Sequence, residues 1–197
     1  MHEIVLDLET EKAFSEVGGR HNLNLLGISV VGIYSYANNT FACYEKEEFK
    51  QLSNILHGSR LLVGFNIKYF DIPVLKTYLA LDLPKIHVLD LMDDVAGHLG
   101  FRVSLDNLAS ATLGSSKSGN GLKAIDWWRA GEKEKVKEYC LHDVKLTRDL
   151  YEFGRENGFV RADTRNGGRV EVRVGWKDLV ASFRQRIEQD NVQPSLI

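Results

Sequence analysis

Apolar residues along this chain form short β-prone runs in the first half and helical repeats in the second. Short aliphatic runs without strict alternation are typical of strands buried on both faces of a sheet. Apolar residues spaced three and four positions apart predict amphipathic helices. Strands are therefore expected at residues 3–9, 25–36, 40–44, 60–65 and 86–90, and helices at 46–56, 71–81, 91–99, 104–113 and 132–154.

Turn and capping residues support several of these boundaries. Asn38-Asn39 is a turn signal between the second and third strands, so these two strands are expected to pair. Ser104 suits the start of a helix and Gly114 suits its end. Residues 115–121 are rich in serine, glycine and lysine, which predicts a loop.

The C-terminal part of the chain has its own pattern. Residues 159–163 and 169–176 flank Asn166-Gly167-Gly168, which predicts a hairpin, and residues 177–189 are expected to form a last helix. Between positions 161 and 177 five basic residues stand against two acidic ones, a local excess of +3. This hairpin either guides nucleic acid or is a soluble edge protected by charge.

The order of elements indicates an α/β fold. We expect a mixed five-stranded sheet, with three antiparallel strands plus parallel strands, flanked by helices and followed by the hairpin and helix. The 197 residues are expected to form one domain, with a core over residues 3–153 and an appendage over residues 158–190.

Composition and charge narrow the classes of protein. The chain is 44% hydrophobic and 26% charged, which predicts a packed core and argues against disorder. The formal net charge of -2 shows no global basic bias, so nucleic-acid binding must depend on local patches. The two cysteines, Cys43 and Cys140, have no metal-site spacing, and no apolar run approaches 18 residues. We expect a soluble, cytoplasmic protein without a membrane partner.

The first strand ends with two acidic residues one position apart. Asp7 and Glu9 share a strand face, whereas Leu6 and Leu8 point to the opposite face. Two carboxylates at this spacing can share one cation and would repel each other without it. A solvated strand exit is the simpler alternative.

A third acid, Asp71, follows the fourth strand. It lies in a segment with Asn66 and Phe70 at the expected start of a helix, where the helix dipole favours an anion. In isolation, an ordinary capping aspartate is the simpler explanation of Asp71, and asparagine is a common turn residue.

The longest predicted helix carries a fourth acid. Tyr139 and Asp143 are four residues apart and therefore neighbours on one face, which also carries Val136 and Leu150. An aspartate on a core-facing stripe is unusual without a partner. The alternatives are a metal ligand or a buried tyrosine–aspartate hydrogen bond that fixes the helix.

Taken as an ordered set, these three motifs resemble the DEDD 3′–5′ exonucleases of the ribonuclease H-like, DnaQ-like superfamily. The resemblance covers about residues 3–153 and is greatest to the tyrosine-bearing (DEDDy) subclass, which includes polymerase proofreading domains. The histidine subclass carries histidine five residues before the last acid, where this chain has Glu138.

This resemblance implies two Mg²⁺ or Mn²⁺ ions about 3.5–4 Å apart. Asp7, Glu9 and Asp143 are expected to hold the ion that activates water, with Asp7 bridging to a second ion. Asp71 would support that second ion directly or through water, and Tyr139 would orient the attacking water. The product would be a nucleoside 5′-monophosphate released from the 3′ end of single-stranded DNA or RNA, with DNA slightly favoured.

Substrate contacts are expected from residues beside these motifs. The candidates are Thr10, Phe14, Asn66, Phe70, Lys117 and Lys123. Cations on phosphates and aromatic rings under bases would suit a single strand, and Trp127 and Trp128 lie in the same region, although core tryptophans and solvated lysines are the simpler interpretation. A catalytically silent module that binds nucleic acid or a protein partner is the alternative function, and the nuclease could belong to a larger replication or repair assembly.

Overall fold

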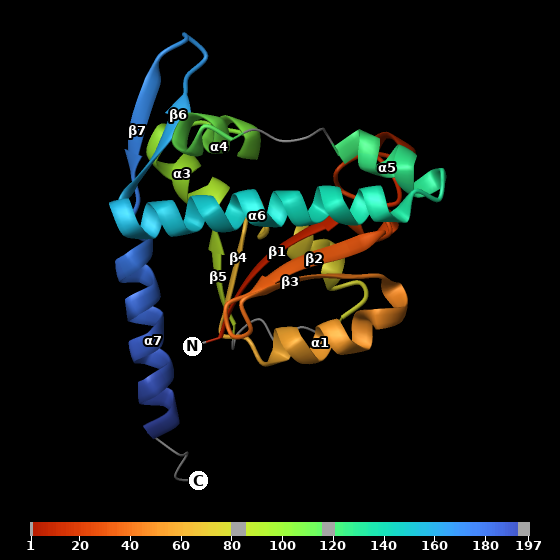
Figure 1. Cartoon of the computed structure of the whole chain (residues 1–197), viewed down its shortest axis with the longest axis horizontal. Helices are drawn as coiled ribbons and strands as arrows, with labels where there is room; N and C mark the ends of the chain where they lie inside the picture. Colours follow the sequence, from red (N-terminus) through yellow and green to blue (C-terminus); the bar gives the residue numbers. More distant parts are fainter. Residues whose placement is uncertain (1, 80–85, 116–120, 193–197) are drawn as a thin grey trace.

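The computed structural model describes residues 2–79, 86–115 and 121–192. Its main sheet contains β1 (Glu3–Glu9), β2 (Val30–Ser35), β3 (Thr40–Tyr44), β4 (Leu61–Gly64) and β5 (His87–Asp90). The strand order is β3-β2-β1-β4-β5 (Figure 1). The β1–β2 and β2–β3 pairs are antiparallel, and the β1–β4 and β4–β5 pairs are parallel. The predicted mixed five-stranded α/β sheet is confirmed.

Helices cover both faces of this sheet. They are α1 (Phe49–His57), α2 (Asp71–Leu75), α3 (Leu91–Leu99), α4 (Leu105–Leu113), α5 (Gly121–Arg129) and α6 (Lys133–Asn157). Alternate residues of β1 point to opposite faces, so Ile4 packs with the α1 and α2 side, whereas Val5 packs with α3, α4 and α6. In Figure 1, α6 and α1 accordingly lie on opposite sides of the sheet.

The C-terminal segment is built into the same core. The hairpin strands β6 (Phe159–Asp163) and β7 (Arg169–Arg173) pair as predicted, and α7 (Trp176–Val192) follows them. Trp176 is 1% exposed, and its Nε1 donates to Asp94 Oδ2 at 2.7 Å. Farther along α7, Phe183 stacks on His87 with 4.0 Å between the ring centroids. Because β5 is an edge strand, this helix limits its access to other chains.

Several predicted boundaries were wrong. The second strand begins at Val30 rather than at residue 25, because residues 23–25 form a short 3-10 turn. The helix predicted over residues 71–81 ends at Leu75, and its last two positions lie outside the described residues. Trp176 belongs to the final helix and not to the hairpin strand.

Two further boundaries also differ. The helix expected over residues 46–56 begins with a 3-10 turn before α1, and α5 was not predicted at all. The loop expected at residues 115–121 falls largely outside the described part, and its last residue, Gly121, begins α5. Within the described ranges, none of the helices is both long enough and apolar enough to cross a membrane.

Candidate metal centre and adjoining pocket

The end of β1 is paired on only one side. Hydrogen bonding to β2 continues to Glu9, whereas the pairing with β4 ends at Val5. The backbone N–H of Leu8 instead donates to Asp71 Oδ1 at 3.1 Å. Asp71 therefore satisfies a main-chain donor that the sheet leaves open, and it lies against the segment that carries Asp7 and Glu9.

Helix α6 approaches β1 and β2 closely because β2 has glycine at position 32. A Cβ atom there would lie 2.7 Å from Cys140 Sγ, which is closer than real contacts allow. Cys140 Sγ in turn lies 3.5 Å from the main-chain oxygen of Asp7. Gly32 thus permits the helix to bring Asp143, one turn further along, toward the strand that carries Asp7.

Both cysteines are free thiols, although the fold brings them together. The Cys43 thiol is hydrogen-bonded to Cys140, and this bond, together with burial and the charge of Asp7, raises the pKa of Cys140. Cys140 consequently stays neutral beneath Asp7 and adds no negative charge to the site.

Three carboxylates meet between β1 and α6. One oxygen from each of Asp7, Glu9 and Asp143 lies within 4.8 Å of the other two. Glu9 is 8% exposed and Asp143 is 2% exposed. Clustered and largely buried carboxylates cost free energy unless cations compensate them, and carboxylate oxygens are the ligands that Mg²⁺ and Mn²⁺ prefer. The donor set therefore fits a divalent cation.

Asp71 lies beside this cluster and has unusual electrostatics. It is 2% exposed, and burial is the main cause that raises the pKa of its carboxyl from 3.8 to about 7, against the effect of the Leu8 N–H. Such a group is uncharged below neutral pH unless a cation is near. This behaviour suits a ligand whose negative charge is compensated by metal.

Tyr139 lies one turn before Asp143 on the same face of α6, as expected from their spacing. It is 3% exposed, and its ring contacts Trp127 with 6.1 Å between the ring centroids. Trp127 and Trp128 belong to α5, not to a loop, and they pack against the small core cluster that contains Tyr139. Helix α5 therefore restricts the position of the Tyr139 side chain.

Asp90 is a structural residue of the site that the sequence did not indicate. It is 1% exposed, and its carboxylate accepts the main-chain N–H groups of Asn66 and Lys68 at 2.9 and 3.0 Å. It also accepts two N–H groups at the start of α3. One carboxylate therefore holds the turn that leads to Asp71, and only its position at the end of a strand, before a helix, offered a signal.

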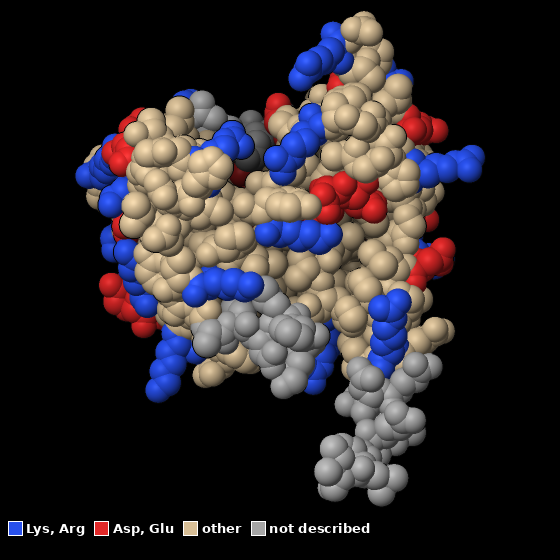
Figure 2. Space-filling model, turned by 180° about the vertical axis from the view of Figure 1, so that it is seen from behind, with Lys and Arg blue, Asp and Glu red and all other residues tan. Residues whose placement is uncertain are grey.

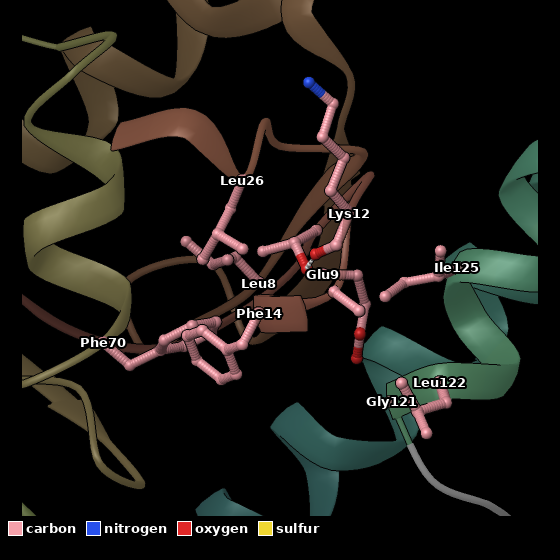
Figure 3. A pocket seen from close by; sticks show the side chains of 11 residues that line it. Leu8, Glu9, Lys12, Phe14, Leu26, Phe70, Gly121, Leu122 and Ile125 are labelled. Carbon is pink, nitrogen blue, oxygen red and sulfur yellow. Dashed lines mark hydrogen bonds between the residues drawn. The ribbon is translucent and has the colours of Figure 1, made fainter. Parts of the chain in front are cut away.

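A pocket of about 320 Å³ opens beside Glu9, within the range of small-molecule sites. Figure 3 shows the rings of Phe14 and Phe70 on one side of Glu9, and Leu122 and Ile125 of α5 on the other. The two rings meet edge to face, with 5.8 Å between their centroids. The pocket therefore has apolar walls and an acidic border.

The expected substrate contacts divide into three groups. Thr10, Phe14 and Phe70 line the pocket. Asn66 does not line it and instead shapes the turn, with φ of 66° and its Oδ1 accepting from Arg102 at 2.6 Å. Lys123 lies on α5 outside the pocket lining, and Lys117 lies outside the described residues.

Pocket residues from α5 were missed because the helix itself was missed. Gly121, at its start, lies close to Glu9: a Cβ there would be 3.9 Å from Glu9 Oε2. Arg129, at its end, pairs with Glu16 at 2.6 Å and so is committed to a surface ion pair. The available signal was the spacing of Leu122 and Ile125, which is helical.

Comparison with protein families agrees with this geometry. The family model described as RNase_H superfamily matches residues 4–153, three quarters of the chain. The chain belongs to the RNase H superfamily. The matched range covers the main sheet except Glu3 and ends in α6, which supplies Asp143. Proteins of the RNase H superfamily generally hydrolyse nucleic acids and typically use divalent metals. No curated protein sequence matches the chain.

Proposed function

We propose that this protein is a metal-dependent 3′–5′ exonuclease of the DEDDy type, which releases nucleoside 5′-monophosphates from the 3′ end of a single strand. The observation that carries this proposal is the cluster of Asp7, Glu9 and Asp143 oxygens within 4.8 Å of one another, beside an apolar pocket. Membership of the RNase H superfamily supports nucleic acid as the substrate.

The acidic side chains would hold the metal. Asp7, Glu9 and Asp143 would bind one Mg²⁺ or Mn²⁺, and Asp7 with Asp71 would support a second. When bound, the cations lower the pKa of a water molecule and neutralise charge on the scissile phosphate. Asp71 keeps its contact with the Leu8 N–H, so this ligand is tied directly to the strand that bears Asp7.

Tyr139 orients the attacking water through its hydroxyl group. A phenol with a pKa near 10 is a poor base at neutral pH, so this role is one of hydrogen bonding and not of proton removal. The packing of its ring against Trp127 restricts where the hydroxyl can lie. Positioning of this kind raises the reaction rate, because the reacting atoms start close to the productive geometry.

The pocket supports cleavage at a chain end. Its apolar walls, with Phe14 and Phe70 on one side and Leu122 on the other, suit the flat faces of a terminal base. Glu9 borders both this pocket and the acidic cluster, so a base held there has its phosphate near the carboxylates. DNA is slightly favoured over RNA by the resemblance to proofreading domains.

Hydrolysis of labelled strands tests the proposal. We expect 5′-labelled single-stranded DNA or RNA to shorten stepwise from the 3′ end with Mg²⁺ or Mn²⁺, and to remain intact with EDTA. A circular single strand has no 3′ end and should survive. Asp143→Asn should reduce kcat by at least a hundredfold, because the carboxylate and its charge contribute to metal binding.

Asp149→Asn is the matched control, since Asp149 makes surface ion pairs on the same helix. This variant should keep wild-type activity. Cleavage of the circle would indicate an endonuclease and contradict the proposal. Binding of the strand without any metal-dependent cleavage would instead support the silent nucleic-acid-binding alternative.

A further inference from the structure

Two exposed aromatic rings and two arginines line two hollows outside the pocket. Tyr69 is 58% exposed and Phe101 is 36% exposed, although both are large apolar side chains. The Arg102 guanidinium lies 5.8 Å from the centroid of the Tyr69 ring. Exposed rings with adjacent arginines can stack bases and contact phosphates at once.

The second arginine comes from the hairpin. Phe101 and the hairpin turn, which contributes Thr164, Arg165 and Asn166, border a hollow of about 450 Å³. On the hairpin strands Arg161 pairs with Glu171, and Arg169 pairs with Asp163. Arg165 forms no ion pair with any residue in the described part of the chain. Its charge is therefore available to a partner.

We call the surface formed by Tyr69, Phe101, Arg102 and Arg165 the hairpin groove. Its Tyr69 end is one residue along the chain from Phe70, which lines the pocket. The hydrogen bond from Arg102 to Asn66 Oδ1 at 2.6 Å joins the segment that carries Phe101 to the turn that carries Tyr69.

The charge of the hairpin groove is positive in a chain of net charge -2. The acidic residue that borders its Tyr69 end is Asp93, which pairs with Lys68 at 3.0 Å. Figure 2, seen from behind, shows Lys and Arg side chains on the projecting hairpin and along the rim of the hollow at its base. A local positive potential of this kind attracts phosphates despite the overall charge.

We propose that the hairpin groove binds the single strand upstream of the 3′-terminal nucleotide. This inference rests on the proposed function, which places the 3′ end in the pocket. The strand leaves the pocket over Phe70 and stacks bases on Tyr69 and Phe101. Its phosphates contact Arg102 and Arg165. The C-terminal hairpin, which lies beyond residues 4–153, thereby adds affinity for longer strands.

Binding measured without catalysis separates this inference from the proposed function. Fluorescence anisotropy in EDTA compares a labelled dodecamer with a labelled dinucleotide across a salt series. The wild type should bind the dodecamer more tightly. Arg165→Glu and Tyr69→Ala should each weaken dodecamer binding about tenfold. Arg165→Ala should also flatten the slope of log K against log salt by about 0.7, as expected for one lost phosphate contact on a single strand.

Arg186→Glu on the distant part of α7 makes the same charge change away from the groove and is the matched control. It should leave the preference for the dodecamer unchanged. If Arg165→Glu and Tyr69→Ala bind the dodecamer as the wild type does, the groove assignment is wrong, whether or not the protein is a nuclease. If both weaken binding but no strand is hydrolysed with metal, the groove stands and the exonuclease proposal fails.

Discussion

At the scale of single residues, the site depends on acids that the fold keeps away from water. Asp71 and Asp143 are each 2% exposed, and Asp90 is 1% exposed. Hydrogen bonds from four main-chain N–H groups offset the free-energy cost of burying the Asp90 carboxylate. Asp71 has fewer such bonds, from the Leu8 N–H and from its own N–H, together with a raised pKa. The difference separates a purely structural carboxylate from one suited to bind a cation.

The raised pKa of Asp71 predicts how stability depends on pH without metal. Between the ordinary aspartate pKa of 3.8 and a pH of about 7, the folded state holds the Asp71 proton and the unfolded chain does not. This contribution to stability is present at low pH and is lost as pH rises through about 7. The melting temperature in EDTA should therefore fall over this interval. In Asp71→Asn, which cannot titrate, the fall should be smaller.

Asp149→Asn, at the surface, should keep the wild-type slope in the same measurement. Added Mn²⁺ should oppose the fall in the wild type near neutral pH, since the metal stabilises the charged carboxylate. Identical slopes for Asp71→Asn and the wild type in EDTA would show that Asp71 is charged in the folded protein.

Tyr139 allows the hydroxyl group to be tested apart from packing. Tyr139→Phe keeps the ring that contacts Trp127 and removes only the oxygen. We expect kcat to fall about a hundredfold, with KM and the melting temperature little changed. Tyr78→Phe, a partly exposed tyrosine on the opposite side of the sheet, is the control. Full activity of Tyr139→Phe would leave Tyr139 with a packing role alone.

At the scale of elements, local periodicity explains what the sequence could predict. The shared face of Asp7 and Glu9 follows from strand geometry, and the proximity of Tyr139 and Asp143 follows from helix geometry. Helix α5 has only a weak periodicity of this kind, because only Ala124 and Ile125 are buried within it. Its contacts with α6 and β1 stabilise it, and these depend on the assembled fold. The role of Asp90 could not be predicted for the same reason, because its bonds to Asn66 and Lys68 form only in the assembled fold.

The packing of α6 on β2 makes a prediction at this scale. In Gly32→Ala the new methyl group would lie 2.7 Å from Cys140 Sγ and 3.1 Å from Val144 Cγ2. The helix must move away from the sheet, so we expect a loss of about 1–3 kcal/mol in unfolding free energy. Because Asp143 moves with the helix, metal affinity should fall as well. Gly32→Ala with unchanged denaturant midpoint and Mn²⁺ affinity would show that α6 is not held by this contact.

At the scale of the whole molecule, the C-terminal segment, β6 to α7, packs into the core of the fold. Glu3 of β1 is 3% exposed and accepts bonds from Tyr151, Arg155 and Arg184. It thereby links the sheet to both α6 and α7. Val160, Val172 and Trp176 belong to the same apolar cluster as β4 and β5, so the hairpin is carried by a rigid base.

The packing of Trp176 against α6 predicts how much the C-terminal segment contributes to the unfolding free energy. A Cβ at Gly154 of α6 would lie 2.3 Å from the Trp176 ring, so Gly154→Ala cannot be accommodated without displacing it. We expect Gly154→Ala to lower unfolding free energy by about 1–3 kcal/mol. Gly97→Ala is the matched helical control, since a Cβ there meets nothing within 4 Å. Replacing an exposed helical glycine should stabilise by up to about 1 kcal/mol. Equal urea unfolding midpoints for Gly154→Ala and Gly97→Ala would show that the Trp176 ring is not packed tightly against Gly154.

Anomalous diffraction from crystals soaked in Mn²⁺ would locate the cation in the proposed metal centre without reference to activity. We expect one peak coordinated by Asp7, Glu9 and Asp143, and a second that Asp7 shares with Asp71. Manganese bound elsewhere, with these four carboxylates uncoordinated at saturating metal, would contradict the proposed metal centre.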